Sequence, residues 1–498
     1  LEQSLAFNEI LKQENEKLQK QVNHLNEQLA WFMRQIFGKR SEKIVLPSIE
    51  DPLLPGFEFP PKEEKKKQVA AHQRTVNRNN TSTLTFPEDL PVERTVIDLK
   101  EEDKINPETG KPLVKIGEDV SQKLAHKPGS YYIKEIVRPK YATSKDSEKT
   151  IVTAELPESL LPRCKVDESF LADILVRKYA DHLPLYRQSE ILAREGINIT
   201  RQLLSQWVLK CGIALKPLYN KMLELILESN NVFIDEVPVG MLKPGKGTLQ
   251  QSFMWVLVGG KQSNPAYRVY NFRINRRHEH AQELLKTYEG MLHSDKYGAY
   301  ETMAQMKKFD WCPCWAHIRR KFFEAEGGDP EFRKLVLRKI KYLFMLERVS
   351  WNSSEEERLH IRITKEVPII DELIAIVKDR LVNGKVLEKS KFKEALGYFC
   401  GLIPYLKNYT THAYARLDNN VAERAVRPLV LGRKNWLFLG SEEGGEAAAI
   451  ILSLVQTCRS LNVNPREYLE DVMRRLLSHS YQKLEELLPD QWSKSQSR

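Results

Sequence analysis

The chain has 498 residues, too many for one hydrophobic core, and this length indicates about three domains. Hydrophobic residues make up 41% of it, enough for packed globular domains, but no apolar stretch approaches the ~18–20 residues that a membrane-spanning helix needs. Lys and Arg total 77 against 67 Asp and Glu, so the net charge of +10 favours a polyanionic partner, most often nucleic acid, with a merely soluble basic protein as the alternative.

Neither a secretory signal nor a disulfide framework is present in the sequence. The N-terminus is rich in Lys and Glu, and six cysteines are scattered over the chain. We therefore expect a cytosolic protein with reduced thiols and no membrane partner.

The first segment has the heptad pattern of a coiled coil. Leu11, Leu18 and Leu25 recur every seven residues, and Asn15 occupies the companion series as a polar position that favours one register and oligomer state. The pattern predicts a homo-oligomer, most simply a dimer, formed through residues 5–37. The alternative is a lone amphipathic helix that packs on its own protein.

Two segments of different character follow. Residues 46–85 are rich in Pro, Lys, Asn and Thr, bury little apolar surface and are expected to form a flexible linker. Residues 86–165 contain short alternating runs, such as 95–99 and 131–137, which predict a small β-rich module.

A helical period begins near residue 169. It predicts helices over 169–180, 185–194 and 201–210, with a Gly-containing turn before the third helix and Thr200 as its N-cap. This arrangement is similar to a helix-turn-helix, although helical hairpins that do not bind DNA share it. If the third helix contacts DNA, the exposed side chains that do so are Arg201, Gln202 and Gln206.

The next section is expected to form one α/β unit. Strands are predicted over 231–238, 252–259, 267–274 and 290–294, with a helix over 277–288. The first three strands are close enough in sequence to form an antiparallel meander, and the helical crossover then allows a parallel fourth strand.

The remainder has a helical pattern. Residues 315–408 read as almost wholly helical, and a new helix begins after Asp418. Residues 447–461 are apolar enough for a buried helix, and 465–488 predict a charged helix or pair of helices.

Three acidic residues occupy positions suited to metal binding. Asp235 ends the apolar run 232–234, Asp295 follows the predicted strand 290–294, and Glu423 lies on the new helix. The long interval before Glu423 is accounted for by an inserted helical subdomain. Carboxylates that converge from two strand ends and a helix can hold two hard divalent cations, as exchange of phosphodiester bonds requires. The alternative is that these are ordinary surface carboxylates.

A cysteine- and histidine-containing segment has two interpretations. Cys312, Cys314 and His317 resemble metal ligands, but the spacing of the cysteines is tight and no fourth ligand is evident nearby, so structural packing is favoured over zinc. His317, Arg319 and Arg320 are candidates for contact with DNA phosphate, with a solvated helix face as the alternative.

Residues on and after the acidic helix are further candidates for DNA contact. Arg433, Lys434 and Trp436 combine cations with an aromatic ring, a useful set for gripping a strand end, and the alternative is a surface turn with a core Trp. Arg427 shares a helix face with Glu423, where it can neutralise phosphate or pair with carboxylates.

Several sequence blocks occur in a fixed order at fixed separations. They are Phe37–Lys43, Lys178–Gln188, Asp235–Val239, Ser294–Tyr300, Cys314–Phe322, Asp418–Pro428 and Gly432–Phe438. On these blocks the chain resembles the DDE-type transposases of the insertion sequence sixty-six family through nearly its whole length.

The resemblance implies a ribonuclease-H-like catalytic domain and a DNA transposase that acts on element ends and target DNA. It implies Asp235, Asp295 and Glu423 as ligands of two Mg²⁺ ions, with Mn²⁺ as a substitute, for strand cleavage and strand transfer. Neighbouring strand residues point to opposite faces, and the family pattern selects Asp235 over Glu236.

The chain departs from many of these relatives in its zinc module. Residues 86–163 contain no cysteine and only His126, so no zinc finger is expected there. The resemblance also leaves open whether small companion proteins are needed, and it implies a prokaryotic, nucleoid-associated location in the cytoplasm.

The expected architecture is multidomain α+β. Its parts are a coiled coil (1–45), a linker (46–85), the β-rich module (86–165), a helical DNA-binding region (166–228), the catalytic domain (229–314 and 410–460) with a helical insertion (315–409), and C-terminal helices (461–498). Two alternatives remain open at this level: a non-catalytic DNA-binding or regulatory protein, and a nuclease without strand transfer.

Overall fold

The computed structural model describes residues 158–492, apart from 163, 165, 244, 261–266, 327 and 385, together with residues 129 and 131 and two short strands. These strands, β1 (Lys140–Tyr141) and β2 (Val152–Thr153), pair in antiparallel fashion. The predicted coiled coil, the linker and most of the β-rich module lie outside the described residues and stay predictions. Within the described part of the chain, no helix is both long and apolar enough to span a bilayer.

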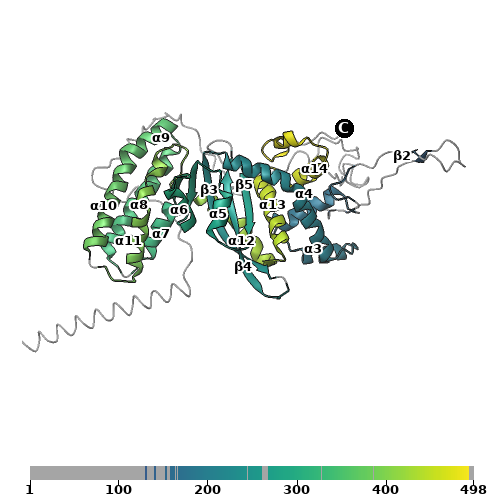
Figure 1. Ribbon diagram of the computed structural model, residues 1–498, viewed down its shortest axis with the longest axis horizontal. Coiled ribbons are helices and arrows are strands. Elements are labelled where there is room, and N and C mark those ends of the chain that lie inside the picture. The colour runs from purple at the N-terminus through teal and green to yellow at the C-terminus, as the bar shows by residue number, and fades with distance from the viewer. Residues whose placement is uncertain are drawn as a thin grey trace, which may run out of the picture. The chain divides into compact units, whose positions relative to one another are not determined.

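A mixed sheet organises the fold and confirms the α+β class (Figure 1). Its strands are β3 (Asn231–Leu242), β4 (Leu249–Gly259), β5 (Tyr267–Arg273), β6 (Met291–Ser294), β7 (Asp310–Pro313) and β8 (Phe438–Leu439). Their order is β5-β4-β3-β6-β7, with β8 also paired to β3. The first three strands form the expected antiparallel meander, and β6 joins β3 in parallel.

The sequence pattern missed β7 and β8. β7 is four residues long, contains a proline and pairs in parallel with β6, so it has no alternating pattern to reveal it. β8 is a two-residue strand that pairs with the far end of β3.

Strand β3 is left partly open on one edge. Residues 231–233 pair with β6 and residues 240–241 pair with β8. Between these two stretches no strand in the described residues pairs with this edge, and Asp235 lies in the gap. Helix α12 (Asn420–Trp436) packs on β3 and β4 near this open edge.

The helical region before the sheet confirms two predicted helices and corrects the third. α2 (Glu168–Tyr179) and α3 (Leu185–Arg194) match their predictions, and Thr200 caps the next helix by accepting from the Leu203 amide. That helix, α4 (Arg201–Leu227), continues far beyond the predicted end at residue 210. The helix continues through Pro217. Packing of one of its faces on the sheet and on α13 (Glu442–Ser460) stabilises it despite this proline.

Helix α13 covers the outer strand β5 and satisfies its backbone. The Tyr270 amide donates to the Ser453 hydroxyl over 2.8 Å, and the Arg268 amide donates to the Thr457 hydroxyl over 3.0 Å. Ser453 and Thr457 are four residues apart and therefore share one helix face. A sheet edge that would otherwise be free to pair with another chain is thus closed by side chains.

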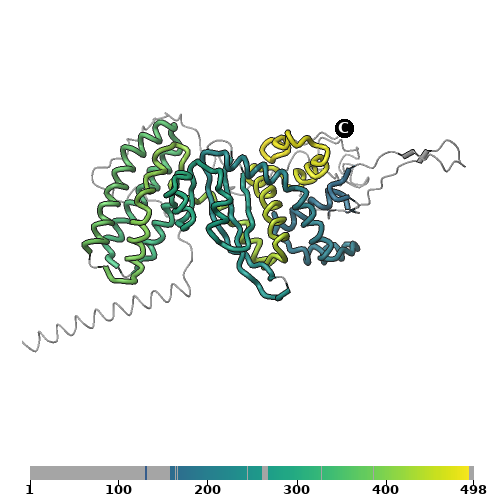
Figure 2. The backbone as a smooth tube through the Cα atoms, in the orientation of Figure 1, coloured from purple at the N-terminus to yellow at the C-terminus, as the bar shows by residue number. Residues whose placement is uncertain are grey.

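The remaining helices outside the inserted segment pack mainly on one another. α5 (His278–Leu284) and α6 (Gly298–Gln305) follow β5 and β6 and pack on each other, with α6 also against β7. At the C-terminal end, α14 (Pro465–Arg475) packs on α2, and Figure 2 shows these late segments beside the first described helices. A 3₁₀ segment, Tyr481–Leu487, follows.

A helical bundle lies between β7 and α12. It contains α7 (Trp315–Glu324), α8 (Pro330–Ser350), α9 (Glu355–Ile361), α10 (Val367–Asn383) and α11 (Lys391–Leu402). A π-helical turn, Arg362–Glu366, joins α9 to α10. Figure 1 shows the bundle gathered at one end of the described unit, with the sheet between it and α4.

Candidate metal-binding site

Two neighbouring strands end at the same edge of the sheet. β6 and β7 run in parallel with Ser294 opposite Pro313, and the Cys314 amide donates to the Ser294 carbonyl over 3.0 Å. The residues that follow these two strand ends, Asp295 and Cys314, are therefore adjacent. Asp235 lies on β3, the strand on the other side of β6.

The loop before α12 is attached to this edge at several points. The side-chain amide of Asn419 donates to the Ile234 carbonyl over 2.9 Å, and its backbone amide donates to the Cys314 sulfur over 3.2 Å. The Trp315 amide donates to the Leu417 carbonyl over 3.1 Å. These contacts place the first turn of α12, which carries Glu423, against both strand ends.

The carboxylates interact electrostatically. Burial, followed by repulsion from Asp295 and Glu236, raises the pKa of Asp235 to about 7, and Glu423 adds a smaller contribution in the same direction. The Glu236 amide donates to Asp235 over 2.8 Å and partly opposes this rise. A positive charge placed among these groups would relieve the repulsion between them.

His317 joins the carboxylates. Its Nδ1 atom lies 2.6 Å from Oδ1 of Asp295 and 3.8 Å from Oε1 of Glu423. Burial alone lowers the pKa of His317, but contacts with Asp295 and Cys314 outweigh it and raise the pKa to about 10. On its other side, Nη1 of Arg320 lies 3.1 Å from Nε2 of His317.

Glu236 has separate partners. Its carboxylate accepts from the Tyr300 hydroxyl and from Nη2 of Arg276, the latter over 2.7 Å. Burial raises the pKa of Glu236, and these two partners oppose the rise. Glu236 is therefore held by a tyrosine and an arginine, whereas the charges that act on its neighbour Asp235 are carboxylates.

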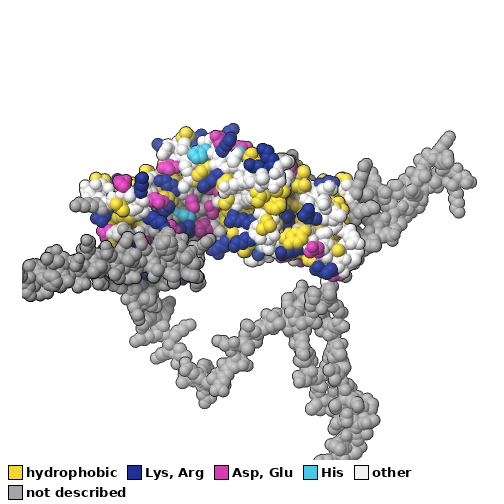
Figure 3. All heavy atoms as spheres, turned by 90° about the horizontal axis from the view of Figure 1, so that it is seen from below, with side chains coloured by type: hydrophobic (Ala, Val, Ile, Leu, Met, Phe, Trp, Pro, Cys, Tyr) yellow, Lys and Arg dark blue, Asp and Glu magenta, His cyan; other side chains and the backbone are white. Residues whose placement is uncertain are grey.

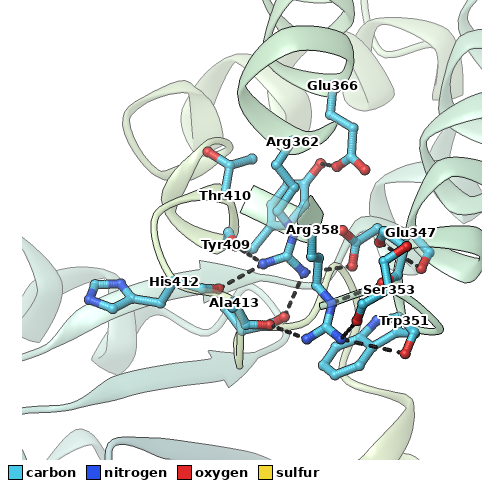
Figure 4. Close-up of polar contacts among 12 residues, drawn as sticks. Glu347, Trp351, Ser353, Arg358, Arg362, Glu366, Tyr409, Thr410, His412 and Ala413 are labelled. Atoms are coloured by element: carbon cyan, nitrogen blue, oxygen red, sulfur yellow. Dashed lines mark hydrogen bonds and ion pairs between the residues drawn. The ribbon is translucent and has the colours of Figure 1, made fainter. Parts of the chain in front are cut away.

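Buried arginines of the inserted bundle hold the segment that returns to α12 (Figure 4). The Arg362 guanidinium donates to both carboxylate oxygens of Glu347, over 2.6 and 2.8 Å. It also donates to three backbone carbonyls of this segment, those of Tyr409, His412 and Ala415. Arg358 donates to the next carbonyl in the same stretch, that of Ala413, over 2.9 Å. The bundle thus fixes the chain immediately before Asn419.

The predicted DNA-contacting residues fall into two groups. Arg201, Gln202 and Gln206 form the first group and are exposed at the start of α4. In Figure 1 the sheet lies between α4 and α7. The second group lies on α7 and α12. Arg320, Arg427 and Lys434 are exposed there, whereas Arg319 and Trp436 are half-buried.

Residues near the C-terminal end of α12 also have partners within the protein. Arg433 donates to the Pro238 carbonyl on the open edge of β3, and the Lys178 ammonium lies 5.7 Å from the centre of the Trp436 ring. Figure 3 shows one face of the molecule, on which acidic side chains gather beside a histidine with Lys and Arg side chains around them. Positive charge therefore surrounds an acidic centre on that face.

Sequence reasoning missed the structural roles of Asn419 and Arg362. Asn419 stands in a recognised block, but its bond to Ile234 depends on a sheet edge that the pattern did not reveal. Arg362 is fully buried in the middle of a helical stretch of ordinary composition, so no local signal distinguishes it.

Comparison with known proteins agrees with this arrangement. Residues 163–447 match the Transposase IS66 family, residues 453–489 match the IS66 C-terminal element, and residues 24–95 match the region described as Transposase C of IS166 homeodomain. The last match falls on residues that the structure does not describe.

Three proteins of Sinorhizobium fredii are similar over most of their length. Protein y4qI is 32% identical over 75% of this chain and 72% of its own length. Protein y4jD is 30% identical over 98% of both chains, and y4hP is 30% identical over 93% of this chain and 87% of its own.

These matches define the class of protein as a transposase, and the edge of its mixed sheet carries an acidic group of the kind that holds metal ions. The chain belongs to the IS66 family of transposases.

Proposed function

We propose that this transposase cuts and joins DNA by the DDE mechanism, with Asp235, Asp295 and Glu423 as its metal-binding carboxylates. The observation that supports the proposal is the meeting of all three at one sheet edge, although the chain brings them from distant positions. The order and directions of β3 to β7 are those expected of a ribonuclease-H-like domain, which supports the same assignment.

The donor atoms suit divalent cations. Oδ1 of Asp295 and Oε1 of Glu423 are buried and both face Nδ1 of His317, at 2.6 and 3.8 Å. Asp235 is held close enough to both for their charges to raise its pKa. Carboxylate oxygens in close proximity are the ligands that Mg²⁺ takes in phosphoryl-transfer sites.

Each part of the site has a distinct task under this proposal. Two Mg²⁺ ions, when bound, stabilise charge on the attacking and leaving oxygens of the phosphodiester. Asp235, Asp295 and Glu423 hold and orient them. Asn419 keeps the helix of Glu423 against the strand of Asp235, and the buried Arg358 and Arg362 fix the segment before it.

We further propose two DNA-contacting surfaces. Arg320, Arg427 and Lys434 lie on the helices that carry His317 and Glu423, so they are placed to contact phosphates next to the reacting bond. Arg201, Gln202 and Gln206 are exposed at a capped helix start after a Gly-containing turn, which suits recognition of the element end in a groove.

The test of catalysis is incubation of the purified protein with a labelled element end and Mg²⁺. Replacing Asp235, Asp295 or Glu423 with Ala should abolish nicked and joined products while end binding is retained. Asp310→Ala is the matched control, because Asp310 is an exposed carboxylate at the opposite end of β7. An alanine variant that still cleaves removes that carboxylate from the mechanism, and a wild-type protein that binds ends without cleaving supports a regulatory role instead.

We also propose that the chain self-associates through residues 5–37, on the heptad pattern of that segment. Deleting residues 1–37 should convert the oligomer to a monomer in multi-angle light scattering. An unchanged mass would contradict the proposal and place the interface elsewhere.

A further inference from the structure

Two of the proposed magnesium ligands converge with a cysteine and a histidine. Asp295, Cys314, His317 and Glu423 each offer one ligand atom, and these atoms all lie within 4.8 Å of one another. They supply two oxygens, one nitrogen and one sulfur. The sequence offered Cys314 and His317 without a fourth ligand nearby, and the fold brings the two carboxylates that complete the set.

The spacing of these atoms suits one small cation. Zn–ligand bonds of about 2.0–2.3 Å in a tetrahedral site place neighbouring ligand atoms roughly 3.3–3.8 Å apart. Nδ1 of His317 lies 3.8 Å from Oε1 of Glu423 and 2.6 Å from Oδ1 of Asp295. Small side-chain rotations therefore bring the set to coordination distance.

The ligand atoms are buried and contact one another. Nδ1 of His317 lies 2.6 Å from Oδ1 of Asp295 and 3.8 Å from Oε1 of Glu423, so a cation would replace a contact that already holds the set together. The buried sulfur of Cys314 accepts from the backbone amide of Asn419 over 3.2 Å. A backbone donor of this kind stabilises a metal-bound thiolate, as hydrogen bonds around metal ligands commonly do.

Two contacts must change on binding. His317 must release the Nδ1 proton that pairs it with Asp295, and coordination through Nδ1 leaves a proton on Nε2, which then cannot accept from Arg320. Because the Arg320 side chain is exposed, it can rotate into solvent without disturbing the core.

We propose that Asp295, Cys314, His317 and Glu423 form a site for one divalent cation of the Zn²⁺ class. Sulfur and nitrogen donors favour zinc over magnesium, which prefers oxygen alone. The site uses two of the carboxylates assigned to magnesium, so bound Zn²⁺ excludes Mg²⁺ from that position. The inference concerns the site of the proposed function, but it depends on the ligand set and not on catalysis.

The full chain titrated with Co²⁺, a spectroscopic substitute for Zn²⁺, tests the ligand set directly. We expect one equivalent to give the visible bands of a four-coordinate ion and a thiolate-to-cobalt charge-transfer band. Cys314→Ser should lose the charge-transfer band. Cys400→Ser, which changes a half-buried cysteine outside the set, should keep it. Absence of the band in the wild type, or its persistence in Cys314→Ser, would overturn the proposal.

A second measurement covers the risk that Cys314→Ser does not fold. His317 is only partly buried, so His317→Ala should fold, and Zn²⁺ affinity measured against a chromophoric chelator should fall by on the order of tenfold or more. An unchanged affinity would overturn the proposal.

Asp235→Asn separates this inference from the proposed catalysis. Asp235 lies outside the four-ligand set, so this variant should lose strand cleavage but keep the cobalt bands. Cobalt bands in a wild-type protein that never cleaves DNA would refute the catalytic proposal alone. Cleavage by a wild-type protein that shows no thiolate band would refute the zinc site alone.

Discussion

The side-chain amide of Asn419 donates to the carbonyl oxygen of Ile234 over 2.9 Å, which joins the loop before α12 to the residue before Asp235. This carbonyl belongs to the edge of β3 that lies between its pairings with β6 and β8. Arg433 reaches a second carbonyl on the same stretch, that of Pro238. Helix α12 is thus fastened to the open strand edge near both of its ends, and Glu423 is held beside Asp235.

Replacing Asn419 with Ala should destabilise the protein and weaken metal binding. The buried Ile234 carbonyl would lose its partner, at a cost of about 1–3 kcal/mol in the free energy of unfolding. Denaturant unfolding measures this loss, and calorimetric titration with Mn²⁺ measures the affinity. Asn435→Ala is the control, because the exposed Asn435 donates within its own helix, to the Leu431 carbonyl. Equal effects of the two substitutions would contradict the role given to Asn419.

Much of the sheet could be predicted from the sequence, because its longer strands carry their own signal. The apolar runs around Ile234, Val256 and Tyr270 predicted β3, β4 and β5 with their antiparallel pairing. β7 could not be found in this way, since a four-residue buried strand containing proline has no period. The predicted end of α4 at residue 210 was also wrong. Gly212 and Pro217 suggest a helix end, but tertiary packing overrides this local preference.

The candidate site also contains residues that the local sequence could reveal and residues that it could not. Asp235, Asp295 and Glu423 could be proposed because each has a local signal: Asp235 ends an apolar run inside β3, Asp295 follows β6, and Glu423 lies in the first turn of α12. His317 was assigned to DNA phosphate, and its contact with Asp295 could not be foreseen without β7. That strand starts α7 directly beside the end of β6, which is a long-range property of the fold and not of the local sequence.

Arg362 should be among the most sensitive positions for stability. It is fully buried and donates to both oxygens of Glu347 and to three carbonyls before α12. Arg362→Met leaves the Glu347 charge buried without its partner, so we expect a loss on the order of 3–5 kcal/mol in denaturant unfolding.

Arg362→Lys refines this test. A lysine keeps the charge but lacks the planar fork, so it should recover only part of the lost stability. Arg338→Met, on the exposed face of α8, should stay within about 0.5 kcal/mol of the wild type. A fully stable Arg362→Lys protein would mean that charge alone, and not the fork, holds the returning segment.

Glu366 should make stability depend on pH. Burial, followed by repulsion from Glu347, raises the pKa of Glu366 well above its ordinary value of 4.5. Because the folded state holds the proton more tightly, this contribution to stability is complete below about pH 4.5 and is lost as the pH rises through the raised pKa. Glu366→Gln stays neutral, so its unfolding free energy relative to the wild type should increase over that range. Parallel pH profiles of the two proteins would show that Glu366 titrates normally.

Two helical glycines should respond to alanine in opposite directions. In α4, a Cβ on Gly212 would lie 2.6 Å from Cβ and 2.8 Å from Cα of Ala447, so α4 and α13 must separate at a cost of about 1–3 kcal/mol. Gly397 lies on the exposed side of α11 with no atom within 4 Å of an added Cβ. Gly397→Ala should therefore stabilise the protein by roughly 0.5–1 kcal/mol, through the lower backbone entropy of the unfolded chain. Thermal unfolding of both variants checks the signs, and a tolerated Gly212→Ala would show that the contact between α4 and α13 is loose enough to admit a methyl group.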